Sequence, residues 1–290
     1  MPTRWPLGYS QTQASDRLIK AIQTPRCCFR SETLGARERP NAGRWLIVNA
    51  DDFGQSQGLN QGIARAHEQG IVTSASLMVR WPAAAAAARY ARRHPGLSLG
   101  LHVDLGEWIC RQGAWRPLYE VVPSDDPKAV HSEIERQIAQ FRQLVGAVPT
   151  HVDSHQHAHR EEPARSVFME AARALGVPLR GSSGIHYRGD FYGQTADGKP
   201  IPRRLSAAGL IRILKSLPLG ISELGCHPGD PAGLETMYLD ERLQEIEVLC
   251  DPLVRAALQA GGITLCSFRD RCVTERTRRP QLGASGGSAR

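Results

Sequence analysis

The sequence lacks several patterns that would place it in a specialised class of protein. Its 290 residues contain no apolar run near the ~20 residues that a membrane span requires. No apolar stretch typical of a secretory signal occurs near its start, so we expect a cytoplasmic protein without a transmembrane segment. A glycine-rich phosphate loop and a repeat of fixed period are also missing. What remains is the ordinary composition of a globular protein, with 41% hydrophobic and 22% charged residues.

The seven cysteines form no recognisable motif. They are scattered along the chain, and no two of them have the C-x-x-C spacing of a zinc knuckle or a redox pair. In a reducing compartment most of them would serve as small buried hydrophobic residues. The sequence therefore predicts neither a disulfide framework nor a cysteine-based metal site.

The positive charge of the chain is concentrated at its two ends. The formal net charge is +7, of which residues 1–44 carry +5 and residues 269–290 carry +4, so residues 45–268 sum to −2. A basic surface for nucleic acid is therefore not indicated on the fold, although contacts made by the ends stay open. Both ends also lack apolar periodicity, so we predict flexible basic extensions at 1–43 and 269–290 around a domain at 44–268.

Apolar runs alternate with helical patterns along the central part of the chain. The runs predict strands at 44–50, 71–79, 97–105, 151–159, 177–183, 220–229 and 262–268. Amphipathic or alanine-rich segments predict helices at 60–70, 82–96, 127–149, 162–176, 206–218 and within 235–260. An irregular segment with Trp108 and Trp115 follows the third strand. We therefore expect an α/β fold, a distorted (β/α) barrel of about seven β–α units that resembles a TIM barrel, with a doubly wound sheet as the alternative.

The string HVDSHQHAH at 151–159 holds four of the ten histidines of the chain. Read as a strand, it would point all four histidines and Asp153 to one face, because strand side chains alternate. A cluster of metal ligands requires such crowding, whereas a solvated loop tolerates it. The string alone leaves both readings open.

Polar residues also end the other predicted strands, at the edge where barrel enzymes carry out their chemistry. Asp51 and Asp52 follow the first strand, His102 lies near the end of the third, and His227 lies near the end of the sixth. Asp52, His102 and His155 would hold one ion and leave open positions for water and substrate. Asp51 would then stay free as a base. The alternatives are turn or capping roles for the two aspartates and a core position for His102.

Five motifs occur in order between Arg44 and Phe268: LIVNADDFG, GIARAHEQGIVTSASLMV, GLHVDL, HVDSHQHAH and ELGCHPG. Together they resemble the YdjC-like family of carbohydrate deacetylases, the ChbG/HpnK group. The resemblance implies a distorted (β/α) barrel. It also implies an enzyme that depends on a divalent metal ion and hydrolyses the acetamido group of an N-acetylated sugar or glycan.

The resemblance assigns roles to individual residues. Asp52 matches the metal carboxylate of the family, and His102 and His155 match its two metal histidines. Asp51 is similar in position to the catalytic base of related sugar deacetylases, and His227 resembles a late histidine near the site. One divalent ion is implied, for which the resemblance suggests magnesium, while the mixed O/N ligands also suit zinc or another transition metal.

These roles predict an amide hydrolysis in which Asp51 accepts a proton from the attacking water and His227 protonates the departing amine. Asp153 is expected either to orient a ligand histidine or to be a solvent-facing turn acid. His157 and His159 could be substrate contacts, spare ligands or surface groups. Two alternatives to a deacetylase stay open. One is another mononuclear metal hydrolase, such as an amidohydrolase or phosphodiesterase, and the other is a catalytically silent protein that binds metal or glycan.

Residues 181–204 depart from the resemblance and have little regular periodicity. Loops of this length in compact domains are usually functional or disordered. We expect the segment to shape the sugar pocket, with Tyr187 and Tyr192 against the pyranose ring and with Arg188 and Asp190 on its hydroxyl groups. The alternative is a mobile surface flap. The sequence identifies neither the sugar nor the oligomeric state, and a homo-oligomer is left open.

Overall fold

The computed structural model describes residues 43–270 and residue 273. The extensions expected at 1–43 and 269–290 therefore lie largely outside the described residues. No helix in the described part of the chain is both long and apolar enough to cross a membrane.

Strands and helices alternate along most of the described chain. The strands are β1 (Arg44–Phe53), β2 (Ser74–Leu77), β3 (Ser98–Val103), β4 (Gly106–Arg111), β5 (Ala114–Glu120), β6 (Val152–Ser154), β7 (His186–Arg188), β8 (Gly220–Cys226) and β9 (Ile263–Leu265). The helices are α1 (Gln57–Glu68), α2 (Ala84–Arg93), α3 (Pro127–Val145), α4 (Ala164–Leu175), α5 (Ala207–Lys215), α6 (Asp240–Leu249) and α7 (Pro252–Ala260), with a short 3-10 helix η1 (His155–Arg160) after β6.

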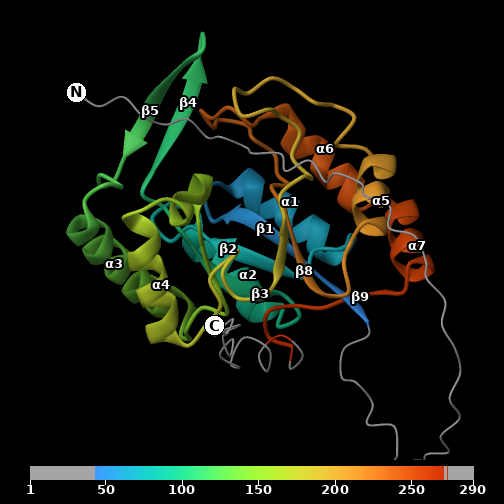
Figure 1. The fold of residues 1–290 in the computed structure, drawn as a ribbon, viewed down its shortest axis with the longest axis horizontal. Coiled ribbons are helices and arrows are strands. Elements are labelled where there is room, and N and C mark those ends of the chain that lie inside the picture. Colours follow the sequence, from blue (N-terminus) through green and yellow to red (C-terminus); the bar gives the residue numbers. More distant parts are fainter. Residues whose placement is uncertain (1–42, 271–272, 274–290) are drawn as a thin grey trace, which may run out of the picture. The chain divides into compact units, whose positions relative to one another are not determined.

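Seven strands form one parallel sheet in the order β6-β3-β2-β1-β8-β7, and β9 pairs with the start of β1. The sheet curls into a half-barrel with helices around it, and no ladder joins β6 to β7 among the described strands (Figure 1). The expected (β/α) barrel fold is therefore confirmed, in the form of a partial barrel. Because the paired strands run parallel, their carboxyl ends meet at one edge of the sheet.

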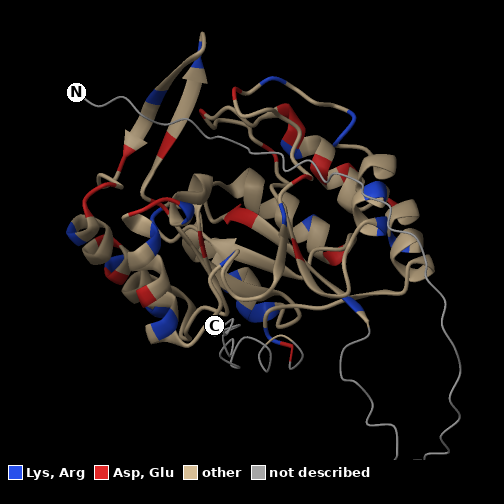
Figure 2. Cartoon of the chain, viewed as in Figure 1, with Lys and Arg blue, Asp and Glu red and all other residues tan. Residues whose placement is uncertain are grey.

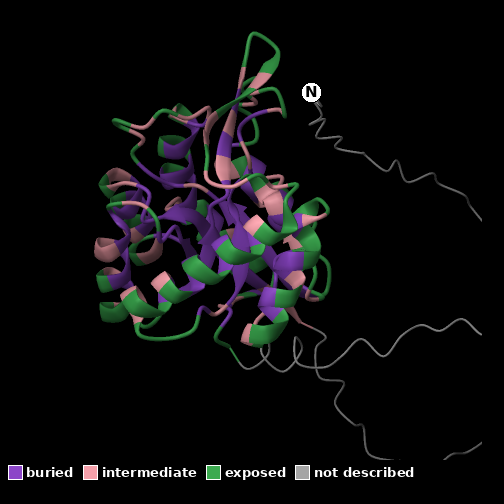
Figure 3. Ribbon diagram, turned by 90° about the vertical axis from the view of Figure 1, so that its left-hand side faces the viewer, coloured by how far each residue is buried: buried purple, intermediate pink, exposed green. Residues whose placement is uncertain are grey.

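The core lies on both faces of this sheet. β1 is buried continuously from Leu46 to Phe53, which is typical of a central strand that is covered on both sides. Helix α3 buries the apolar stripe that its sequence predicts, Val130, Ile134, Ile138 and Phe141. Figure 3 shows the buried strands at the centre, with exposed residues on the outer helices.

The strand expected at 151–159 is wrong beyond its first residues. β6 ends at Ser154, and the chain then enters η1, where Gln156 (φ 47) and His157 (φ 57) have left-handed backbones. The alternation of side chains therefore stops before the later histidines. Local hydrogen bonds to Ser154 favour the turn, because its hydroxyl accepts a hydrogen bond from the backbone N–H of His159 at 3.0 Å.

The strand expected at 177–183 is also wrong. Only Leu179 pairs in that segment, through one isolated bridge to Val152. The strand that extends the sheet is β7, which lies inside the segment 181–204 and pairs with β8. Gly181 and Gly184 precede it with φ of 74° and 73°, so the backbone turns where a continuous strand was expected.

The segment with Trp108 and Trp115 is not irregular. It forms the antiparallel β4–β5 hairpin, in which Arg111 pairs with Ala114 across a turn at Gln112 (φ 53) and Gly113 (φ 77). Two successive residues with positive φ are typical of the tight turns that join such hairpins. The hairpin projects from the half-barrel (Figure 1).

We predict that Gly100→Ala destabilises the fold. A methyl group at Gly100 in β3 would lie 2.3 Å from the ring of His151, which cannot retreat because it stacks on Phe268 with ring centroids 3.8 Å apart. Overpacking of this kind costs about 1–3 kcal/mol of unfolding free energy, measurable by urea denaturation. Gly96→Ala is the control, because its methyl group would meet nothing closer than 3.9 Å. Equal stability of the two variants would contradict the close packing of β3 on His151.

Candidate metal centre and active site

Strands of the sheet bring ionisable side chains to its carboxyl edge. β1 carries Asp51 and Asp52 near its end, and β3 carries His102. His155 follows β6 directly, and His227 follows β8. The sequence predicted all five at this edge, and the structure brings them together. Figure 2 shows acidic residues within the central strands as well as on the outer helices.

Asp52, His102 and His155 form the group that is best suited to hold a metal ion. Oδ1 of Asp52 lies 3.3 Å from Nε2 of His102 and 3.1 Å from Nδ1 of His155. All three residues are buried, and one ligand atom from each lies within 4.8 Å of the others. Asp52 has a left-handed backbone (φ 64), at a register shift in the pairing of β1 with β2. Asp51 and Asp52 can therefore face different partners.

The chemistry of this group fits a divalent cation. The buried carboxylates of the group and of its close neighbours outnumber the buried guanidinium groups: the former belong to Asp51, Asp52, Glu107 and Asp153, and the latter to Arg180 and Arg242. Burial lowers the pKa of His102, but the carboxylates of Asp153, Asp52 and Asp51 outweigh it and raise that pKa to about 9. A divalent ion would supply the same positive charge and leave the histidines neutral.

Asp153 holds the ring of His102 in place. Nδ1 of His102 donates a hydrogen bond to Oδ1 of Asp153 at 2.7 Å, so Nε2 faces Asp52. A carboxylate on the second ring nitrogen is the usual partner of a metal-bound histidine. Asp153 is completely buried, so its alternative role as a solvent-facing turn acid is wrong.

A second group with metal-binding geometry consists of Asp51, His102 and Asp153. Its two carboxylates already bind the guanidinium group of Arg180, with N–O distances of 2.7 Å. A cation among these residues would compete with that guanidinium group. The group around Asp52 is therefore the better candidate.

Arg180 is a site residue that the sequence reasoning missed. Its side chain is fully buried, and each of its three nitrogens contacts a carboxylate at 2.7 Å: those of Asp51, Asp153 and Glu223. Burial raises the pKa of Asp51, but the charge and hydrogen bonds of Arg180 dominate and hold that pKa below its usual range. A lone arginine inside the apolar run VPLRG was the available signal, because a buried guanidinium group requires buried carboxylates.

His227 lies beside Asp51 and is anchored by helix α6. Its Nε2 is 3.7 Å from Oδ2 of Asp51, and its backbone N–H donates a hydrogen bond to Glu245. Arg242 of the same helix binds Oδ2 of Asp52 at 2.7 Å. Burial lowers the pKa of His227 to about 4, because it outweighs the negative charges of Asp51 and Asp52, which act to raise that pKa. The imidazole is therefore neutral at neutral pH.

The two later histidines of the cluster lie outside the candidate metal group. His159 is buried, and its Nδ1 lies 2.7 Å from the hydroxyl oxygen of Ser154. Nε2 of His157 lies 3.4 Å from the hydroxyl oxygen of Tyr187. Burial lowers the pKa of both imidazoles. Both histidines are therefore neutral groups of the barrel wall.

The segment 181–204 brings two tyrosines to the site. Tyr187 contacts Arg180, whose guanidinium carbon lies 5.0 Å from the ring centroid. Tyr192 stacks on Tyr238 with ring centroids 4.3 Å apart, and its ring packs edge-to-face with that of His227 with centroids 5.5 Å apart.

Arg188 and Asp190 of the same segment bind each other, with Nη2 and Oδ2 2.6 Å apart. Arg188 also donates a hydrogen bond to Ser216, at the end of α5, at 3.0 Å. The structure therefore pairs these two side chains away from the group around Asp52.

The chain is thus a parallel half-barrel protein that carries an Asp–His–His group with metal-binding geometry at the carboxyl ends of its strands. The family model described as YdjC-like protein matches residues 45–260. The chain belongs to the YdjC-like family.

Carbohydrate deacetylases of other organisms are similar in sequence to most of the chain. A chitooligosaccharide deacetylase of Serratia marcescens is 33% identical, in a match that covers 78% of this chain and 98% of the relative. A carbohydrate deacetylase of Geobacillus stearothermophilus is 32% identical with the same coverage. A solved structure from Enterococcus faecalis V583, provisionally named for cellobiose-phosphate cleavage, has a TM-score of 0.63, is 24% identical, and covers 78% of this chain and 98% of its own. This last likeness concerns the fold.

We predict that the chain binds one divalent ion and that His155→Ala removes it. At an ion concentration of about 100 times Kd, binding should raise the unfolding free energy of the wild type by about 2.7 kcal/mol. Elemental analysis and thermal unfolding with and without chelator measure both effects. His186→Ala, which changes an exposed histidine, should keep the metal. A His155→Ala chain with unchanged metal content would show that the ion lies elsewhere.

Proposed function

We propose that the chain is a metal-dependent carbohydrate N-deacetylase that hydrolyses the acetamido group of an N-acetylated sugar. The observation that carries the proposal is the position of Asp51, which lies beside the group formed by Asp52, His102 and His155. The names of the relatives supply the substrate class, because they describe deacetylation of carbohydrates and chitooligosaccharides.

The residues that would hold the ion are Asp52, His102 and His155. A divalent ion bound there supplies polarisation of the acetyl carbonyl and a lowered pKa for a water molecule. Arg242 occupies the second oxygen of Asp52, so that carboxylate offers a single oxygen to the site. Magnesium and zinc both remain compatible with this ligand set.

Asp51 is the proposed general base. Arg180 binds both of its oxygens at 2.7 Å, which keeps the carboxylate ionised and fixes its plane. The same contact makes Asp51 a weak base, because a proton on it would face a guanidinium group. A water molecule whose pKa a bound ion had lowered would need only a weak base. Asp51 therefore accepts the proton only as the water attacks.

His227 is the proposed acid for the departing amine. An amide nitrogen leaves only when it is protonated, so the reaction requires a donor at this point. The imidazole starts neutral, and its Nε2 lies 3.7 Å from Oδ2 of Asp51. The proton that Asp51 takes from the water can pass to Nε2 and from there to the amine.

Tyr187 and Tyr192 are the proposed contacts for the sugar ring, as expected for the segment 181–204. Tyr192 is the better placed of the two, because it touches His227 and one of its faces stacks on Tyr238. Arg188 and Asp190 bind each other, so they enter the proposal only as a pair that fixes the backbone between the tyrosines.

Asp51→Asn should keep the metal and abolish turnover. The carboxamide cannot accept the proton, and general base catalysis typically contributes about 10²–10⁴-fold. Acetate release from a chitobiose-type substrate, with and without chelator, measures the loss. Asp125→Asn changes an exposed aspartate and should match the wild type.

An Asp51→Asn rate within a factor of two of wild type would rule out the base. Hydrolysis of a phosphodiester without acetate release would favour a different metal hydrolase. Tight binding of metal and glycan without any turnover would favour a silent binding protein.

Tyr192→Ala should raise KM for the sugar roughly two- to tenfold, in line with the ~0.5–1.5 kcal/mol of aromatic stacking. The metal content should change little, because the ring contacts of Tyr192 in the described part of the chain are with His227 and Tyr238 and not with the candidate ligand histidines. Tyr192→Phe is the control and should keep KM near the wild-type value. An unchanged KM in the alanine variant would remove Tyr192 from the sugar pocket.

A further inference from the structure

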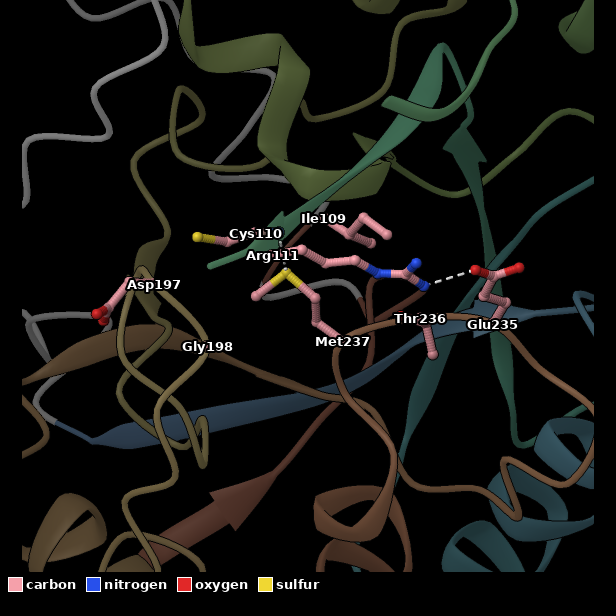
Figure 4. A pocket seen from close by; sticks show the side chains of 8 residues that line it. All are labelled: Ile109, Cys110, Arg111, Asp197, Gly198, Glu235, Thr236 and Met237. Atoms are coloured by element: carbon pink, nitrogen blue, oxygen red, sulfur yellow. Dashed lines mark hydrogen bonds and ion pairs between the residues drawn. The ribbon is translucent and has the colours of Figure 1, made fainter. Parts of the chain in front are cut away.

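The β4–β5 hairpin projects from the half-barrel (Figure 1), yet the start of β4 lies next to the candidate ligand His155. Glu107, its second residue, is only 2% exposed. Farther out, Arg111 forms an exposed ion pair with Glu235 at 2.7 Å, at a surface pocket of about 260 Å³ (Figure 4). The hairpin is therefore held at two places, and the inner one adjoins His155.

Nε2 of His155 lies 3.5 Å from Oε2 of Glu107, and Nδ1 of the same ring faces Asp52 at 3.1 Å. Nε2 is buried and makes no hydrogen bond to any described residue. This arrangement repeats the one at His102, whose second nitrogen binds Asp153. Each candidate ligand histidine thus presents one nitrogen to Asp52 and the other to a separate buried carboxylate.

The backbone that follows His155 is strained. Gln156 and His157 are consecutive residues with left-handed backbones, φ 47 and 57. Residues other than glycine adopt this conformation at a cost, and it persists only where the surroundings enforce it. The conformation of this turn determines where the ring of His155 lies.

The side chain of Gln156 fastens this turn to the hairpin. Its Nε2 donates a hydrogen bond to the carbonyl oxygen of Trp108 at 2.8 Å, and its Oε1 accepts one from the N–H of Trp108 at 2.9 Å. The amide thus pairs with both backbone groups of one residue, as a neighbouring strand would. Trp108 directly follows Glu107, so both contacts act on the same end of β4.

We propose that Glu107 and Gln156 are positioning residues that hold the His155 ring for the ion, which makes the β4–β5 hairpin a structural part of the metal centre. This inference rests on the proposed metal site. Glu107 acts through the second nitrogen of His155, and Gln156 acts through the strained turn. Neither side chain belongs to the group of ligand atoms that lie within 4.8 Å of one another.

The affinity for Mn²⁺ tests the proposal without any substrate, because the electron paramagnetic resonance signal of free Mn²⁺ reports binding directly. Glu107→Gln keeps the shape of the side chain and removes its charge, and we expect it to weaken Mn²⁺ binding by about 10–100-fold, as for other partners of metal-bound histidines. Gln156→Ala should weaken binding to a similar extent. The loss of Mn²⁺ affinity should be several-fold smaller in Gln156→Gly than in Gln156→Ala, because glycine adopts the left-handed backbone without strain.

Glu235→Gln is the matched control. It removes an ion pair of the same hairpin at the far end from His155, and its Kd for Mn²⁺ should stay within twofold of wild type. Thermal unfolding without metal checks that each variant is folded. Because Gln156 is exposed, we expect both of its variants to fold.

The outcomes separate this inference from the proposed function. If either Glu107→Gln or Gln156→Ala binds Mn²⁺ within twofold of wild type while His155→Ala does not bind it, the positioning role is wrong and the metal site stands. Equal losses in Gln156→Ala and Gln156→Gly would overturn the role given to the strained turn. A wild-type chain that binds no Mn²⁺ would overturn both proposals.

Discussion

The guanidinium group of Arg180 binds carboxylates that come from β1, β6 and β8, and it is completely buried. Removing one partner of such a buried set typically costs about 3–5 kcal/mol, because charges are left without compensation. Arg180 follows Leu179, which pairs with Val152 of β6 through an isolated bridge at the edge of the sheet. Its ion pairs therefore connect the segment that follows this edge to β1, β6 and β8. The same contacts keep Asp51 ionised.

The arrangement of the site follows from that contact step by step. Arg180 fixes Asp153, and Asp153 fixes the ring of His102. On the opposite side, Arg242 of α6 holds the second oxygen of Asp52. The candidate metal group is thus supported from two directions by buried guanidinium groups. Arg242 leaves Oδ1 of Asp52 facing His102 and His155, where a cation would bind.

Much of the fold could be predicted from the sequence because its signals are local. β1 reads as an apolar run that ends in two aspartates, and α3 reads as a stripe of apolar residues at helical spacing. In a parallel sheet the ends of strands share one edge, so the residues that end β1, β3, β6 and β8 could be grouped without coordinates. The same rule led to Asp52, His102 and His155 as a set.

The features that escaped prediction depend on contacts between distant parts of the chain. Arg180 is a lone charge whose partners lie on three other segments, and Arg242 approaches the site from a helix near the end of the domain. The left-handed turn at Gln156 is held by the backbone of Trp108, 48 residues earlier. Periodicity carries no information about such contacts. Periodicity therefore predicts a strand where the chain turns and an irregular segment where the hairpin forms.

An anomalous difference map from crystals grown with Mn²⁺ would locate the ion without any assumption about its ligands. We predict a single strong peak per chain within bonding distance of Asp52, His102 and His155, with Asp51 beside it and still bound to Arg180. A map without a peak at these residues, or with its strongest peak at another place on the chain, would contradict the assignment of this metal centre.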